Sequence, residues 1–125
     1  EECTSRRSRS NIPQQALVML NDPAFVEAAR KFGERIAAVE GNEEEKILMG
    51  MKLATGRTAT ADEIGALRSV YEWQRAEYTK NPGAALEFLS VGEAPAAETT
   101  EVAEAAAWAQ VGRTILNAYE TTARN

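Results

Sequence analysis

Histidine is absent from this 125-residue sequence, and cysteine occurs only once. The first absence removes the side chain that most often acts as a general base near neutral pH and most often binds metals. The second excludes an internal disulfide and a cluster of thiolate ligands. Serine triads of the usual kind, histidine zinc sites, Cys-x-x-Cys-His haem attachment and Glu-x-x-His iron sites are therefore excluded within this chain. We predict no catalytic residue, no metal site and no cofactor in it.

Long apolar runs and a surplus of basic residues are missing as well. No run approaches the ~20 apolar residues that span a bilayer, so we expect no membrane insertion. The net charge is -5, which argues against nucleic-acid binding because a phosphate backbone requires a basic face. Hydrophobic residues make up 44% and charged residues 26%, as in ordinary soluble domains. The length fits a single domain with a buried core.

The first residues form a polar, serine-rich stretch without periodicity. We expect residues 1–11 to be a connecting arm and residues 12–125 to be a helical domain. The only basic cluster of the arm stands beside two glutamates: Arg6, Arg7 and Arg9 next to Glu1 and Glu2. A short charge run is typical of a solvated arm, and a site for phosphate or a polyanion is the alternative. Because the chain starts without an initiating methionine or a leader, we expect it to be cut from a longer protein, with an upstream domain missing.

Helix start and stop signals divide the remainder into about six segments. The first expected helix follows Pro13 and ends near Asn21. Capping residues, prolines and glycines mark the later boundaries, at Asp22-Pro23, Gly41-Asn42, Gly56, the Thr60–Glu63 capping box, Asn81-Pro82, and Thr99 or Thr100. No stretch alternates as a half-buried strand does, and no tight hairpin signal lies between apolar runs. The predicted fold is all-α, an irregular bundle of about six helices in a single domain.

Apolar residues recur at helical spacing in most of these segments. After Pro23, one face carries Phe25, Ala29, Phe32, Ile36 and Val39, which predicts that this face is buried. The segment that begins near Asn42 is apolar nearly all round, so we expect it to pack on more than one side. In the last helix, the small residues Ala105, Ala109 and Gly112 would let a neighbouring helix approach closely.

Residue types that could carry chemistry have structural explanations here. Paired carboxylates can serve acid–base hydrolysis, but the acidic groups Glu43–Glu45, Asp62-Glu63 and Glu101 with Glu104 all stand in first helical turns, where capping and the helix dipole favour them. Exposed aromatic rings could form a sugar-binding platform. Most of the aromatic residues instead lie at the spacing of core positions, and Met49 and Met51 are interpreted as core residues. Trp73 is the aromatic residue that lies outside the apolar face of its helix.

Four polar residues flank the two ends of the first expected helix: Arg9, Asn11, Asn21 and Asp22. Capping and hydrogen bonds that anchor the arm explain them. The sharper alternative is a ligand- or partner-binding site that faces the missing upstream domain. These four residues are therefore the candidate site residues.

The run from Arg7 to Arg30 resembles the C-terminal part of the planctomycete-specific domain family, whose function is unknown. Shorter matches extend the resemblance along nearly the whole chain: Gly56-Arg57, Thr60–Glu63, Val91–Pro95, Ala107-Trp108 and Leu116-Asn117. The sequence departs from the family at Ile12–Gln15, where Thr-Pro-Leu-Gln is common. The resemblance implies a large exported parent protein in planctomycetes, with an uncharacterised domain upstream and frequently a cytochrome-c-like domain, and hence a haem, elsewhere in the parent.

Two hypotheses follow. The first is a non-catalytic structural or interaction module at the C-terminus of a larger exported multidomain protein, with upstream domains of the same polypeptide as its partners and a periplasmic or cell-surface location implied by the resemblance. The second is that the chain contributes residues to an enzyme or redox site, related to polysaccharides, that forms with those upstream domains. An anion-binding arm is a third reading. Neither the ligand nor the oligomeric state follows from the sequence.

Overall fold

The computed structural model describes residues 22–92 and 101–124, with side chains as far as residue 118 in the last helix. Within those residues it contains five helices and no strand. They are α2 (Pro23–Ala38), α3 (Glu43–Thr55), α4 (Ala61–Lys80), α5 (Pro82–Leu89) and α6 (Val102–Arg124). The all-α prediction is confirmed. The sixth expected helix, between Pro13 and Asn21, lies outside the described residues.

The helix boundaries follow local capping chemistry. The Asp22 side chain accepts a hydrogen bond from the Ala24 amide at the start of α2, and Pro23 occupies its first turn. Asn42 and Thr60 each form a capping box at the start of α3 and α4. Such boxes satisfy amide groups that have no partner within the helix. The boundaries expected at these positions are confirmed.

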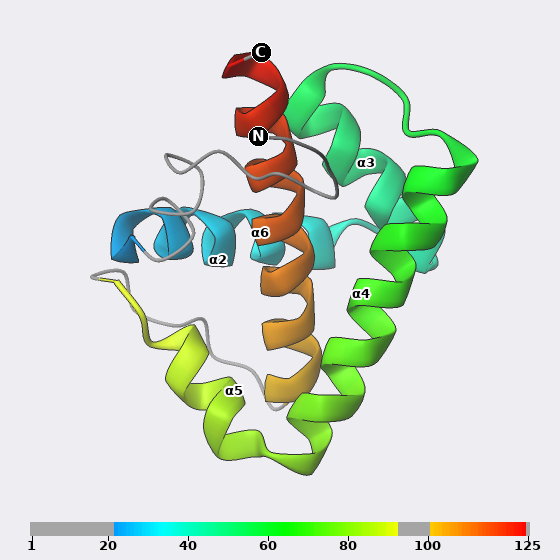
Figure 1. Ribbon diagram of the computed structural model, residues 1–125. Coiled ribbons are helices and arrows are strands. Elements are labelled where there is room, and N and C mark those ends of the chain that lie inside the picture. The colour runs from blue at the N-terminus through cyan, green and yellow to red at the C-terminus, as the bar shows by residue number, and fades with distance from the viewer. Residues whose placement is uncertain (1–21, 93–100, 125) are drawn as a thin grey trace, which may run out of the picture.

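Helix α6 stands in the middle of the bundle and contacts each of the other four described helices (Figure 1). It contributes to two buried clusters on different faces. One face packs with α2, α3 and α4 through Trp108, Val111 and Ile115. The other packs with α5 through Ala106 and Ala109. The core of the described domain is therefore built around its last helix.

Helices α2 and α6 cross at very short range because small residues line the crossing. A β-carbon placed on Gly112 would lie 2.9 Å from the backbone oxygen of Ala29 and 3.2 Å from the backbone nitrogen of Gly33. Such distances leave no room for a side chain. The close approach expected from Ala109 and Gly112 is confirmed, and its partner is α2.

The prediction that α3 packs on more than one side is wrong. Ile47, Gly50 and Met51 are buried, but Met49 is 43% and Leu53 46% exposed. The helix lies at the edge of the bundle, so only one of its faces meets the core (Figure 1). Consequently Met51 fills the core as expected, whereas Met49 does not. Trp73, which lies outside the apolar face of its helix, is also largely exposed, at 62%.

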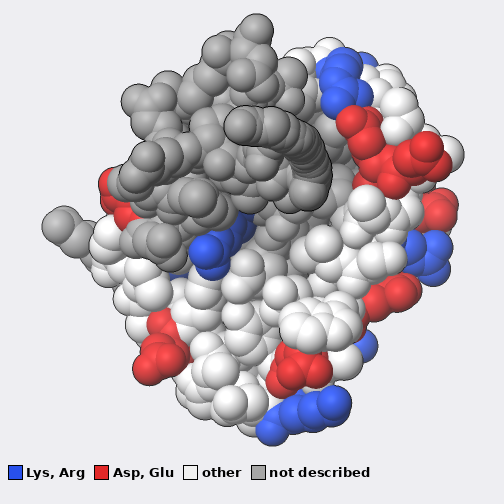
Figure 2. Space-filling model, viewed as in Figure 1, with Lys and Arg blue, Asp and Glu red and all other residues white. Residues whose placement is uncertain are grey.

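Charged side chains of both signs are mixed on the surface of the described part. Figure 2 shows acidic and basic groups alternating along the side where α3 and α4 lie. Several of them form ion pairs between exposed side chains, such as Arg57 with Glu63 at 2.6 Å. None of the described helices is long and apolar enough to traverse a lipid bilayer.

Candidate functional site

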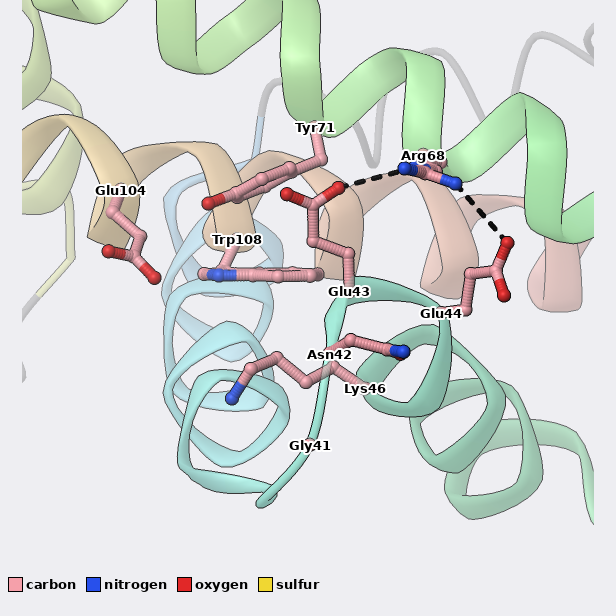
Figure 3. A pocket seen from close by; sticks show the side chains of 9 residues that line it. All are labelled: Gly41, Asn42, Glu43, Glu44, Lys46, Arg68, Tyr71, Glu104 and Trp108. Atoms are coloured by element: carbon pink, nitrogen blue, oxygen red, sulfur yellow. Dashed lines mark hydrogen bonds and ion pairs between the residues drawn. The ribbon is translucent and has the colours of Figure 1, made fainter.

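A cleft of about 440 Å³ opens where three helices and a loop meet. The loop between α2 and α3, the first turn of α3, the middle of α4 and the start of α6 each contribute to its wall (Figure 3). The lining residues are Gly41, Asn42, Glu43, Glu44, Lys46, Arg68, Tyr71, Glu104 and Trp108. The volume of the cleft is in the range of small-molecule sites in proteins.

Two stacked aromatic rings form one wall of the cleft. The centroids of Tyr71 and Trp108 are 4.2 Å apart, and the ring planes differ by 27°. Both residues are buried, with 5% and 1% of their surface exposed. Pairs of this kind contribute roughly 0.5–1.5 kcal/mol beyond the area they bury. The stack joins α4 to α6.

Arg68 gathers the carboxylates at one edge of the cleft. Its Nε lies 3.4 Å from Glu43 Oε1 and 3.4 Å from Glu72 Oε2, and its Nη1 lies 3.2 Å from Glu44 Oε2. These groups are between 38% and 59% exposed, so each pair contributes little to stability on its own. Their role is to hold the first turn of α3 against α4.

Lys46 closes the opposite side of the cleft. Its ammonium group donates hydrogen bonds to the carbonyl oxygens of Ala37, at 2.7 Å, and of Val39. Both carbonyls belong to the C-terminal end of α2, where backbone acceptors lack helical partners and a cation is favoured. The ammonium is thus engaged with the protein itself.

Two buried polar atoms of the cleft have no hydrogen-bond partner. Trp108 Nε1 and Glu43 Oε1 are buried and form no hydrogen bond, although Glu43 lies near Arg68. The pKa of Tyr71 reflects the electrostatic environment of the cleft. Burial, and then the nearby carboxylate of Glu104, raise the pKa of the Tyr71 phenol to about 12. Burial and negative charge both disfavour the phenolate.

The groups that line the cleft can bind a ligand. Tyr71 is held in its neutral form by its raised pKa, and no described serine, threonine or cysteine lines the cleft beside a base. In the part of the chain that the structure describes, no three carboxylate, thiol or imidazole side chains come together to hold a metal ion. What the cleft offers is an acidic rim and a buried hydrogen-bond donor.

The residues predicted from the sequence do not enter this cleft in the described structure. Asp22 is exposed and caps α2, at the opposite end of that helix from Gly41. Sixteen helical residues separate the two ends, which corresponds to roughly 24 Å. Arg9, Asn11 and Asn21 lie outside the described residues. The site proposed for these four residues stays a prediction.

Sequence reasoning missed the cleft because each lining residue had a sufficient local explanation. Glu43 and Glu44 were expected in a first helical turn, and Tyr71 and Trp108 were expected in the core. All four expectations hold. What identifies the cleft is that these residues lie close together, and this depends on how α3, α4 and α6 pack. Helical spacing within one segment carries no such information.

Comparison with known proteins identifies one family. Residues 1–71 match the PSD1 family, described as "Protein of unknown function (DUF1553)". The match includes α2 and α3 and ends at Tyr71, within α4. Neither the curated proteins nor the solved structures include a significant match. Because the matched residues make up more than half of the sequence, the chain belongs to the PSD1 family of proteins of unknown function.

Proposed function

We propose that this chain is a non-catalytic interaction module at the C-terminus of a larger exported protein, and that it packs on upstream domains of the same polypeptide. The exposed apolar face of α3 is the observation that carries this proposal. Membership of a family of unknown function assigns no activity. The multidomain parent, its planctomycete origin, its cytochrome-c-like domain and its periplasmic or cell-surface location rest on the resemblance of the run from Arg7 to Arg30.

The apolar face of α3 consists of Met49 and Leu53, which are four residues apart and therefore neighbours on the helix surface. They are 43% and 46% exposed. Beside Met49 lies a shallow depression of about 290 Å³ whose wall includes Leu48, Lys52 and Thr58. Apolar side chains grouped beside a depression, with charged groups at its rim, are typical of a surface that another protein segment covers.

The test compares a double-charge variant of the full-length parent protein with a single-charge control. Met49→Lys with Leu53→Lys should lower the thermal stability of the upstream domains, because the lysines prevent burial of this face. Each substitution should change the free energy of unfolding of the helical bundle itself by only about 0.5 kcal/mol, since both side chains are exposed.

Leu86→Lys is the matched control, because Leu86 is 54% exposed on a different helix, α5. It should leave the upstream domains unchanged. Differential scanning calorimetry of the parent measures both effects. Removal of the whole chain should destabilise the parent more strongly than the double variant does. A parent that keeps its stability after that removal would disprove the proposal.

A further inference from the structure

The two cations of the Tyr71–Trp108 cleft are already engaged with protein groups. Lys46 donates to two backbone carbonyls, and Arg68 is shared among three carboxylates. A negatively charged ligand would therefore meet the acidic rim without an available cation. The cleft is unsuited to an anion.

The groups left over lie at one end of the aromatic stack. The indole nitrogen of Trp108 and the hydroxyl of Tyr71 are both on the side of the rings where Glu104 lies (Figure 3). Trp108 is 1% exposed, and its Nε1 has no hydrogen-bond acceptor. Glu104 forms no hydrogen bond or ion pair with any residue that the structure describes. A buried donor without an acceptor costs roughly 1–3 kcal/mol.

The space beside these groups continues beyond the main cleft. A second hollow of about 280 Å³ is also lined by Trp108 and Glu104, together with Glu101 and Ala105. The indole edge and the Glu104 carboxylate thus border both hollows. A ligand seated there would reach a hydrogen-bond donor and a carboxylate at the same time.

We propose that this end of the cleft binds a small organic ammonium ion that carries a hydroxyl group. The ammonium group lies against Glu104, and the hydroxyl oxygen accepts the hydrogen bond from Trp108 Nε1. A hydrocarbon ligand would leave the indole donor unsatisfied, and a bare metal ion would offer it no acceptor. A ligand with both a cation and an acceptor satisfies both groups, and its cation forms the stronger, charge-assisted hydrogen bond with Glu104. This inference is independent of the interaction-module proposal, which concerns the outer face of α3.

The test follows the two indole N–H signals of the chain by ¹⁵N NMR, since the sequence has two tryptophans. A Trp73→Phe variant assigns the Trp108 signal. The probes are D-glucosamine, D-glucose and cyclohexylamine, at about pH 6, where the amines are protonated. Glucosamine should bind in the millimolar range and shift the Trp108 signal downfield. Glucose, which lacks the charge, should bind at least about tenfold more weakly.

Cyclohexylamine, which lacks the hydroxyl, should bind without the downfield shift. Glu104→Gln should weaken glucosamine binding at least about tenfold, whereas Glu87→Gln on α5 should leave it unchanged. Circular dichroism of both variants checks that the helices are intact. The proposal is overturned if glucosamine leaves the Trp108 signal in place, if glucose binds as tightly as glucosamine, or if Glu104→Gln binds as the control does.

Discussion

Gly33 of α2 lies directly against the backbone of Ala109 in α6. A β-carbon on Gly33 would come within 2.6 Å of Ala109 Cα and 2.7 Å of its backbone nitrogen. Neither atom can rotate away, unlike the end of a side chain. The separation of α2 and α6 is therefore set by the missing side chains of Gly33 and Gly112.

Gly33→Ala should destabilise the chain by about 3 kcal/mol, because the two backbones must move apart and the packing of Trp108 is disturbed. Urea denaturation followed by circular dichroism measures the change. Gly65→Ala is the matched control: Gly65 is also helical, but a β-carbon there meets nothing within 4 Å. It should stabilise α4 by about 0.5–1 kcal/mol. Equal effects of the two substitutions would contradict the close crossing.

Glu63 should make stability sensitive to acid. Its side chain accepts hydrogen bonds from Arg57 and from the Thr60 amide, and these lower the pKa of the Glu63 carboxyl to about 2. Because the folded pKa lies below the unfolded value of about 4.3, the stabilisation is fully present above that value. It is lost as the pH falls through about 2.

Thermal unfolding between about pH 5 and pH 2 tests this dependence. Glu63→Gln can still cap α4 but has no charge to titrate, so its stability should fall less steeply with acid than that of the wild type. Arg57→Met removes the main cause of the lowered pKa and should also reduce the slope. A wild-type slope in both variants would refute the assignment.

Lys46→Met should destabilise the chain by about 1–2 kcal/mol. The substitution keeps the length of the side chain but leaves the carbonyls of Ala37 and Val39 at the end of α2 without their cationic donor. Lys52→Met is the control, because Lys52 is exposed on the same helix. It should change the free energy of unfolding by no more than about 0.5 kcal/mol. Guanidinium denaturation compares the two; a larger loss in the control would show that general charge, not this contact, matters.

Arg30→Met should be nearly neutral, within about 1 kcal/mol, although Arg30 is only 1% exposed. Its Nη1 donates to the Val91 carbonyl, but its Nε and Nη2 are buried without partners. Removing those donors offsets the lost hydrogen bond. Arg30→Ala should cost about 2 kcal/mol, because it also empties the space of the side chain. If methionine proves as harmful as alanine in urea denaturation, the guanidinium group itself is needed.

The helix boundaries could be predicted almost to the residue because capping is local. Asn42 and Glu45, or Thr60 and Glu63, satisfy each other's amides whatever surrounds them. The buried face of α2 was also predictable from its spacing at Ala29, Phe32 and Ile36, whereas Phe25 and Val39 are only partly buried. The burial of Arg30 was not predictable. Whether a position beside that face is covered depends on the segment around Val91. The prediction that the outer face of α3 is buried was wrong for the same reason. An apolar sequence does not show how many other elements pack on a helix.

The candidate cleft was beyond sequence reasoning for a related reason. Glu43, Tyr71 and Glu104 are each explained by their own helix, and 61 residues separate the first from the last. Their meeting depends on the small residues at the crossing of α2 and α6, which fix where the first turn of α6 stands. A pattern within one helix can predict a cap or a face, but not a site that three helices share.

The central position of α6 also determines when the core can form during synthesis of the chain. During synthesis, α2, α3, α4 and α5 all leave the ribosome before the helix against which they pack. Until Trp108, Val111 and Ile115 emerge, Phe32, Ile36 and Leu67 lack their main apolar partners. The nascent bundle therefore exposes its future core until α6 is made, and such an exposed apolar surface is prone to aggregation.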